Sequence, residues 1–226
     1  MSDKKKKLMF VVSSPFALNS FLKPHITFLK DDFDIHICVN ESLYEIDPDI
    51  KNIAQIYDIP IQRKISPLKD LNGLWKLFLV FLKVRPMLVQ SITPKAGLLA
   101  MAAGWLCRIP NRWHTFTGQY WENKTGIYRH FLKNADRAVA LFATKLAADS
   151  PSQARFLKSE NVTIGKEITV IGDGSIAGVD IKRFKPDDEF RKNFRKQHQV
   201  PDDHIIFLFV GRLAQEKGVF DLLAAF

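Results

Sequence analysis

The chain has 226 residues, of which 46% are hydrophobic and 25% are charged, and it contains 11 glycines and 11 prolines. These proportions are typical of a globular protein with a sizeable core and exclude a disordered or fibrous chain. The formal net charge of +9 predicts an anionic partner, which could be nucleic acid, a membrane surface or a small substrate. Because the sequence contains no recognition-helix, zinc-finger or RNP-like pattern, we expect no nucleic-acid partner.

The N-terminal segment combines a run of lysines, Lys4 to Lys7, with an apolar run from Leu8 to Val12. This apolar run is shorter than the roughly 7 to 15 residues of a secretory signal core, so it predicts a first buried strand behind a solvated basic leader. Cys38 and Cys107 lie far apart in apolar segments, and we interpret them as buried thiols in a reducing compartment.

Short apolar runs alternate with longer amphipathic stretches along the whole chain. The apolar runs predict strands over residues 8–12, 35–39, 59–63, 87–91, 112–116, 146–150, 167–171 and 205–210. Helices are expected over residues 18–30, 68–84, 94–107, 125–143, 151–159 and 187–198. This repeated order predicts an α/β fold, in which a parallel sheet carries helices on both faces.

The most apolar stretch outside the strands is 74–82, which is interrupted by Lys76. It is far shorter than the ~20 residues that cross a bilayer. It predicts a core helix, and a helix that lies on a membrane surface is the alternative.

A glycine-rich segment, 172–178, interrupts the alternation of strands and helices. Its spacing is G-x-G-x-x-x-G, and the residues after it predict an extended piece and not a helix N-terminus. This pattern favours a flexible connection between domains over a dinucleotide-binding loop. We therefore expect a first domain over 1–170, a connection over 171–202 and the opening of a second domain over 203–226.

Polar residues follow several of the predicted strands. Ligands of parallel α/β sheets bind beyond the carboxyl ends of the strands, so these residues are candidates for one site. They are Ser13, Ser14, Lys95, His114, Thr115, Thr117, Gly118 and Gln119. Hydroxyl, imidazole, amide and ammonium groups at one edge predict a site for a polyhydroxylated, anionic ligand. For His114 alone, a structural histidine is an equally good interpretation.

Two cations lie between the last predicted strand and the helix that follows it. Gly211 and Arg212 end the strand, and Lys217 opens the helix five residues later. An arginine and a lysine in this arrangement can hold one diphosphate together with the helix N-terminus. Isolated surface charges would carry no such meaning, so the hypothesis depends on the whole segment FVGRLAQEKG.

FVGRLAQEKG, preceded by VIGDGSIAGVDIKRFKP, resembles the domain junction and donor-domain opening of the retaining GT-B glycosyltransferases of family 4. ITPKAG, HTFTGQ and ADSPSQ resemble the bacterial branch of that family, which builds capsular, O-antigen and related surface polysaccharides. The resemblance covers essentially the whole chain. It implies a Rossmann-like acceptor-side domain over 1–170 and the start of a nucleotide-sugar-binding domain over 203–226.

The resemblance also implies roles for the candidate residues. Gly211, Arg212 and Lys217 would hold the diphosphate of a UDP-sugar donor, and neither a metal nor another cofactor is expected. The acceptor cleft would be lined by Ser13, Ser14, Lys95, Thr115, Thr117, Gly118 and Gln119, with His114 as the catalytic residue near the reacting centre. The acceptor would be a lipid-linked saccharide, so we expect a cytoplasmic protein at the inner, anionic face of the cytoplasmic membrane.

The sequence departs from the family in two places. Ser13-Ser14-Pro15 replaces the glycine-rich turn after the first strand, and the family's Glu-x7-Glu donor motif would lie beyond Phe226. We therefore expect an N-terminal fragment or truncated product that is inactive by itself. Two alternatives stay open. One is a non-catalytic acceptor-binding or membrane-docking module that partners another transferase, and the other is a nucleotide-sugar epimerase.

Overall fold

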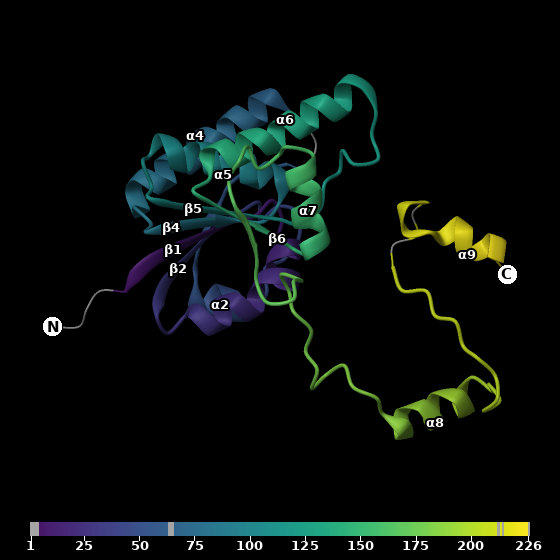
Figure 1. Cartoon of the computed structure of the whole chain (residues 1–226). Coiled ribbons are helices and arrows are strands. Elements are labelled where there is room, and N and C mark those ends of the chain that lie inside the picture. The colour runs from purple at the N-terminus through teal and green to yellow at the C-terminus, as the bar shows by residue number, and fades with distance from the viewer. Residues whose placement is uncertain (1–4, 63–65, 212, 214, 226) are drawn as a thin grey trace. The chain divides into compact units, whose positions relative to one another are not determined.

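The computed structural model describes residues 5–62, 66–211, 213 and 215–225 (Figure 1). The chain divides into two compact units, Met1–Gly178 and Val179–Phe226. The first unit therefore extends to Gly178, whereas the sequence placed the end of the first domain at residue 170.

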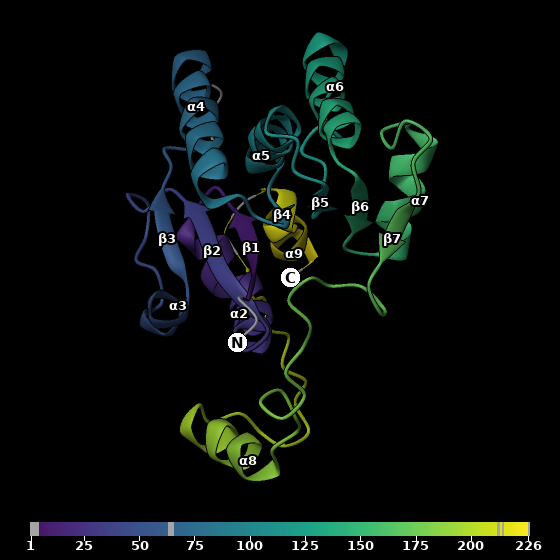
Figure 2. The same ribbon diagram turned by 90° about the vertical axis from the view of Figure 1, so that its left-hand side faces the viewer.

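Seven parallel strands form one sheet in the first unit. They are β1 (Lys6–Val11), β2 (Phe33–Val39), β3 (Gln55–Asp58), β4 (Leu88–Ser91), β5 (Asn111–Phe116), β6 (Lys145–Ala148) and β7 (Ile168–Val170). Their order across the sheet is β3-β2-β1-β4-β5-β6-β7 (Figures 1 and 2). The order reverses between β1 and β4, and such a reversal is where parallel sheets bind their ligands.

Helices cover both faces of this sheet. One face carries α4 (Pro67–Val84), α5 (Pro94–Leu106) and α6 (Gly126–Phe142), which stand in a row in Figure 2. The remaining elements of the unit are α1 (Pro15–Ala17), the π-helical turn η1 (Leu18–Leu22), α2 (Lys23–Leu29), α3 (Pro48–Ile53) and α7 (Pro151–Ser159). The α/β fold with a covered parallel sheet is thus confirmed.

The buried side chains form two clusters because strand residues alternate between the two faces of the sheet. Met9 and Val11 pack with Leu77 of α4 and the small residues of α5. Phe10, between them in sequence, packs in the second cluster with Ile26 of α2. A strand buried on both faces needs an unbroken apolar run, which explains the run at the start of the chain.

Local chemistry sets the helix ends. Proline occupies the first turn of α3, α4, α5 and α7, where its missing N–H costs nothing. The Ser150 hydroxyl caps α7 by accepting a hydrogen bond from the Gln153 N–H at 3.1 Å. At the end of α6, the Lys166 ammonium donates to the carbonyls of Ala140, Leu141 and Ala143 at 2.6 to 3.0 Å.

The second unit contains α8 (Asp188–Gln197), the 3-10 turn η2 (Gln215–Lys217) and α9 (Val219–Ala225). Asp187 caps α8 by accepting from the Phe190 N–H at 2.8 Å. The buried Arg195 guanidinium donates to the carbonyls of Pro201 and His204, which ties the loop after α8 to that helix.

Three expectations about elements were wrong. Residues 205–210 are not in a strand, because an apolar run becomes a strand only when it joins a sheet, and the local sequence does not determine that. The edge strand β3 lies at 55–58, whereas residues 59–62, where Pro60 has no N–H to donate, are not in a strand, and residue 63 of the expected strand lies outside the described residues. The helix expected over 18–30 is divided into η1 and α2, with Pro24 in the first turn of α2, and it is preceded by the short α1.

Candidate functional site

Hydrogen bonds join the loops that follow β1, β4 and β5 at the carboxyl edge of the sheet. The Ser13 N–H donates to the Thr93 hydroxyl at 3.2 Å, and the Thr117 hydroxyl donates to the Ile92 carbonyl at 3.0 Å. Three loops are therefore held side by side where the strand order reverses. The sequence-based candidates Ser13, Ser14 and Thr117 lie in this part of the fold.

Two candidate hydroxyls at this edge are buried. The hydroxyls of Ser14 and Thr115 have no hydrogen-bond partner among the described residues. Most buried polar groups in proteins do have a partner, because an unpaired one costs about 1–3 kcal/mol. Neither hydroxyl reaches the surface as it stands, so a contact with a ligand would need a local rearrangement.

His114 lies inside the unit, between β5 and α5, with 1% of its surface exposed. Its Nδ1 atom is 2.8 Å from the Ser91 hydroxyl, and its ring meets the Phe116 ring edge-on. Burial lowers the pKa of His114 to about 3, because the charged imidazolium would lose its hydration. The ring is therefore neutral at physiological pH, and any role in catalysis would be that of a neutral hydrogen-bonding group.

Lys95 stands in the first turn of α5 and forms an ion pair with α4. Its ammonium is 2.7 Å from Asp70 Oδ1, and the other Asp70 oxygen accepts from the Ser66 N–H at 3.1 Å. The pair joins the N-termini of two neighbouring helices at the carboxyl edge of the sheet. The sequence pointed to Lys95 but gave no signal for Asp70.

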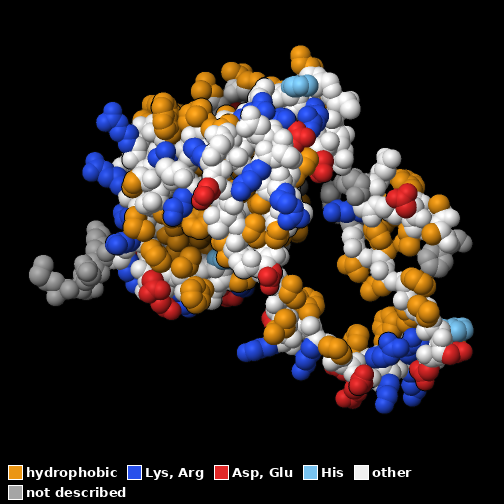
Figure 3. All heavy atoms as spheres, viewed as in Figure 1, with side chains coloured by type: hydrophobic (Ala, Val, Ile, Leu, Met, Phe, Trp, Pro, Cys, Tyr) orange, Lys and Arg blue, Asp and Glu red, His pale blue; other side chains and the backbone are white. Residues whose placement is uncertain are grey.

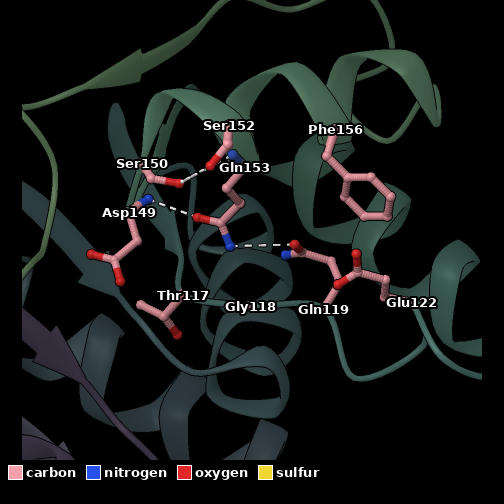
Figure 4. A pocket seen from close by; sticks show the side chains of 9 residues that line it. All are labelled: Thr117, Gly118, Gln119, Glu122, Asp149, Ser150, Ser152, Gln153 and Phe156. Carbon is pink, nitrogen blue, oxygen red and sulfur yellow. Dashed lines mark hydrogen bonds between the residues drawn. The ribbon is translucent and has the colours of Figure 1, made fainter.

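A pocket of about 460 Å³ opens between the loop after β5 and the start of α7 (Figure 4). Thr117, Gly118, Gln119, Glu122, Asp149, Ser150, Ser152, Gln153 and Phe156 line it. Amide, hydroxyl and carboxylate groups on one side and an aromatic ring on another suit a ligand rich in hydroxyl groups.

Gln153 links the two walls of this pocket. Its Oε1 accepts from the Asp149 N–H at 2.7 Å, and its Nε2 donates to Gln119 Oε1 at 3.3 Å (Figure 4). The Nε2 of Gln119 has no partner among the described residues. Behind the pocket, the Phe156 ring stacks on Trp121 with 5.4 Å between ring centroids. The loop after β5 is therefore held against α7 from both sides.

Asp149, Ser150 and Gln153 line this pocket but were not among the site residues predicted from the sequence. The signal was present, because Asp149 and Ser150 end a predicted strand and the carboxyl-edge rule applies to that strand as well. Gln153 could not be found in this way, since its place depends on how α7 packs on the neighbouring loop.

The expected donor residues belong to the second unit. Gly211 is exposed, and the exposed Lys217 ends η2, one residue before the start of α9. Arg212 lies outside the described residues. Within the described part of the chain, no cluster of three His, Cys, Asp or Glu side chains is placed to hold a metal ion. None of the described helices has the length and apolar character needed to cross a membrane.

Comparison with known proteins relates the chain in sequence, along its whole length, to a glycosyltransferase. The chain is 30% identical over 227 aligned residues to the capsular polysaccharide biosynthesis glycosyltransferase CapM of Staphylococcus aureus. The match covers 99% of this chain and 57% of that protein, so the chain spans a little over half of the relative's length. No family model matches the chain.

Solved structures share the fold. Anabaena HepE, crystallised in complex with UDP, superposes with a TM-score of 0.63 and 17% identity, over 97% of this chain and 57% of that one. A UDP-N-acetylglucosamine 2-epimerase from Rickettsia bellii gives a TM-score of 0.58 and 13% identity, over 87% of this chain and 52% of that one. The chain therefore has the Rossmann-like α/β fold of GT-B proteins, and its sequence relates it to glycosyltransferases of polysaccharide synthesis.

Proposed function

We propose that this chain forms the acceptor-side domain and the opening of the donor domain of a retaining, family 4 GT-B glycosyltransferase. The enzyme would move a sugar from a UDP-sugar to a lipid-linked saccharide in the synthesis of a surface polysaccharide. It would act on the cytoplasmic side of the membrane, peripherally bound, with neither metal nor other cofactor.

One observation carries this proposal above the others, and it is the 30% identity to CapM, which extends over 99% of the chain. An identity spread over both units is expected when the whole segment serves the same reaction. The resemblance of FVGRLAQEKG to the family's diphosphate-binding segment, which lies within this alignment, supports the same conclusion.

The geometry supports a saccharide acceptor in the first unit. The pocket beside Gln153 presents amides, hydroxyls, carboxylates of Glu122 and Asp149, and the ring of Phe156. Sugar hydroxyls both donate and accept hydrogen bonds, and the apolar face of a sugar ring packs well on an aromatic ring. Lys95, Ser13 and Thr117 mark the carboxyl edge of the sheet, at which the acceptor would bind.

In the donor domain, Gly211, Arg212 and Lys217 would hold the diphosphate of the UDP-sugar. Lys217 ends η2, and only Gly218 separates it from α9, so a cation and helix N–H groups could share one anion here. Two cations at a departing diphosphate do electrostatically what a metal ion does elsewhere.

Two alternative functions are a nucleotide-sugar epimerase and a non-catalytic binding module. A nucleotide-sugar epimerase shares the fold, as the Rickettsia structure illustrates, but at 13% identity that likeness concerns the fold alone. A non-catalytic acceptor-binding or membrane-docking module would use the first unit without the donor residues. An epimerase would convert the UDP-sugar itself, whereas a binding module would bind the acceptor and change neither molecule.

The test extends the chain through the donor domain by joining it, within the GRLAQEKG segment, to the C-terminal part of CapM. The hybrid is incubated with a panel of UDP-sugars and lipid-diphosphate saccharides, and products are identified by mass spectrometry. Transfer to the lipid-linked saccharide is expected. Lys217→Ala should weaken donor binding by about tenfold or more, because it removes a charge-assisted contact to phosphate.

Lys192→Ala, an exposed lysine of α8, is the matched control and should leave donor binding unchanged. A folded hybrid that transfers no sugar would overturn the proposal. Conversion of the free UDP-sugar without an acceptor would favour an epimerase. Acceptor binding by the 226-residue chain, without transfer by the hybrid, would favour the binding module.

A further inference from the structure

The outward faces of α4 and α6 carry large apolar side chains that the fold leaves in solvent. On α4 they are Leu68, Leu71, Trp75, Leu79 and Leu82, with exposed fractions from 47% to 84%. On α6 they are Ile127, Phe131 and Leu141, with exposed fractions from 56% to 89%. We call these eight side chains the outer apolar face. Figure 3 shows hydrophobic side chains along the edge that α4 and α6 form in that view.

The spacing of these residues places them opposite the core. On α4 they recur every three or four residues, which puts them in one stripe of the helix. The buried residues Gly73, Leu77, Phe81 and Val84 form a second stripe toward the sheet. A helix at the surface of a globular domain usually presents polar residues to solvent, so an apolar stripe on both sides needs an explanation.

The α4 stripe extends over about 20 Å of helix from Leu68 to Leu82, given a rise of 1.5 Å per residue. Trp75 lies near its middle, 57% exposed, and stacks on Phe78. Scattered exposed apolar residues are common in soluble proteins, but a contiguous line of leucines around a tryptophan is not.

Lysines run beside this stripe. Lys69, Lys76 and Lys83 recur every seven residues, so they lie along one side of the apolar stripe, and all three are exposed. None of them forms an ion pair with any residue that the structure describes. They are therefore available to an external anion.

Acidic groups are nearly absent from these two helices. Their sequences contain only Asp70 and Asp136. Asp70 pairs with Lys95, and Asp136 is buried and accepts from the Trp121 indole at 2.7 Å. The outer apolar face and the lysines beside it therefore present apolar and cationic groups to solvent.

We propose that the outer apolar face docks on an anionic lipid bilayer. The apolar side chains would enter the boundary between headgroups and acyl chains, and the three lysines would reach the lipid phosphates with their flexible stems. The tryptophan suits this depth, because indole rings concentrate at membrane interfaces. The biological purpose of this docking rests on the proposed function, in which the acceptor is lipid-linked. The binding of the chain to vesicles can be measured without that acceptor.

Charge favours lipid over a second copy of the chain. A symmetric dimer through this face would bring two rows of lysines together, and each chain carries a formal net charge of +9. An anionic bilayer instead attracts the same lysines, and the attraction adds to the burial of apolar surface.

The experiment measures binding of the 226-residue chain to vesicles of phosphatidylcholine with and without phosphatidylglycerol, without sugar donor or acceptor. Sedimentation and quenching of tryptophan fluorescence by brominated lipid report the bound fraction and the depth of the indoles. Binding is expected on the anionic vesicles, and it should weaken as salt is added.

Two variants separate the apolar and electrostatic contributions. Trp75→Ser with Leu79→Ser should lower the partition coefficient by about tenfold or more. Lys69→Glu, Lys76→Glu and Lys83→Glu together should remove the preference for phosphatidylglycerol. The matched control is Phe28→Ser with Lys51→Glu, an exposed pair on α2 and α3 that should bind as the unaltered chain does. Circular dichroism confirms that each variant is folded.

Unchanged binding in both variant sets, or no binding by the unaltered chain, would overturn this proposal. A dimer seen by sedimentation velocity that disappears in the serine variant would overturn it in favour of self-association. Failure of sugar transfer by the hybrid enzyme with intact vesicle binding would count against the proposed function and leave the docking surface standing.

Discussion

The imidazole of His114 lies directly against the backbone of Gly97, one turn into α5. A β-carbon on Gly97 would come within 2.4 Å of His114 Cε1 and 2.7 Å of Nδ1. Glycine is therefore required at this position by the neighbouring ring and not by its own backbone conformation. The contact explains how β5 and α5 approach closely enough to bury the histidine.

The first prediction concerns Gly97→Ala. The added methyl group must push the His114 ring from its place beside Ser91, which should cost about 1–3 kcal/mol as in other overpacked cores. This cost should exceed the ~1 kcal/mol that alanine contributes to an exposed helix relative to glycine. Urea unfolding measures the difference.

Gly73→Ala in α4 is the matched control. Its β-carbon would meet Leu99 Cδ1 at 3.5 Å, an ordinary contact, so the change should be neutral or stabilising. Equal effects of the two substitutions would show that helix propensity, and not the His114 contact, decides the outcome.

The second prediction concerns the contribution of His114 to the pH dependence of the free energy of unfolding. Its pKa in the fold is about 3, below the value of 6.5 expected for an unfolded chain. As the pH falls below 6.5, the unfolded chain binds a proton that the folded protein does not, so stability is lost by up to ~1.4 kcal/mol per pH unit.

His114→Gln should remove this contribution and flatten the free energy of unfolding between about pH 6 and pH 4. The slope is the relevant quantity, because the substitution also changes packing. His130→Gln, an exposed histidine of α6, should keep the slope of the unaltered chain. A slope that His114→Gln leaves unchanged would mean that the imidazole is protonated in the fold.

The place of His114 illustrates what the sequence could predict. Short apolar runs located β1, β2, β4, β5, β6 and β7, and the carboxyl-edge rule then selected the loop after β5. The sequence could not predict whether the ring faced the cleft or the core. That depends on Gly97 and Ser91, which are neighbours only in the folded protein.

The segment 205–210 illustrates the opposite case. Its apolar run predicted a strand, but strand formation depends on a hydrogen-bonding neighbour, which a local pattern does not report. The pocket beside Gln153 was predicted only in part, because a local sequence pattern does not report tertiary neighbours. Its β5 loop followed from the strand pattern, whereas its α7 wall depended on tertiary packing.

The third prediction concerns Asp136, whose pKa is raised to about 6 by burial, an effect that the hydrogen bond from Trp121 partly offsets. Between the unfolded pKa of about 4 and this value, the folded protein holds a proton that the unfolded chain releases. Stability therefore falls as the pH rises through this window, and the full cost, on the order of 2–3 kcal/mol, is present above it.

Asp136→Asn should raise the free energy of unfolding at pH 7 and remove this pH dependence, because the amide oxygen still accepts from the Trp121 indole. Asp31→Asn, at an exposed site, is the control and should change little. A less stable Asp136→Asn protein at pH 7 would indicate that the fold stabilises the ionised carboxylate, for which Arg129 and Lys133 over the Trp121 ring are the candidate cations.

The last prediction concerns Asp149, which fastens the glycine-rich segment to the first unit. Its carbonyl accepts from the Ser175 N–H at 2.7 Å, and its carboxylate accepts from the Ile176 N–H. Gly174, at a φ of +103°, passes so close that a β-carbon would lie 2.5 Å from the same carbonyl. The sequence predicted a flexible connection over 172–178, and residues 174–176 of this segment are held against the loop that lines the pocket.

Asp149→Ala should release Ile176 and destabilise the first unit by about 1.5–3 kcal/mol, the range for a hydrogen bond to a charged group. Amide exchange at Ser175 and Ile176 should become faster, while exchange in β1 keeps its protection. Asp149→Asn retains an oxygen acceptor and should behave nearly as the unaltered chain. If Asp149→Ala leaves exchange at Ile176 unchanged, the segment is held by its own turn, in which the Gly178 N–H donates to the Ser175 carbonyl, and not by the carboxylate.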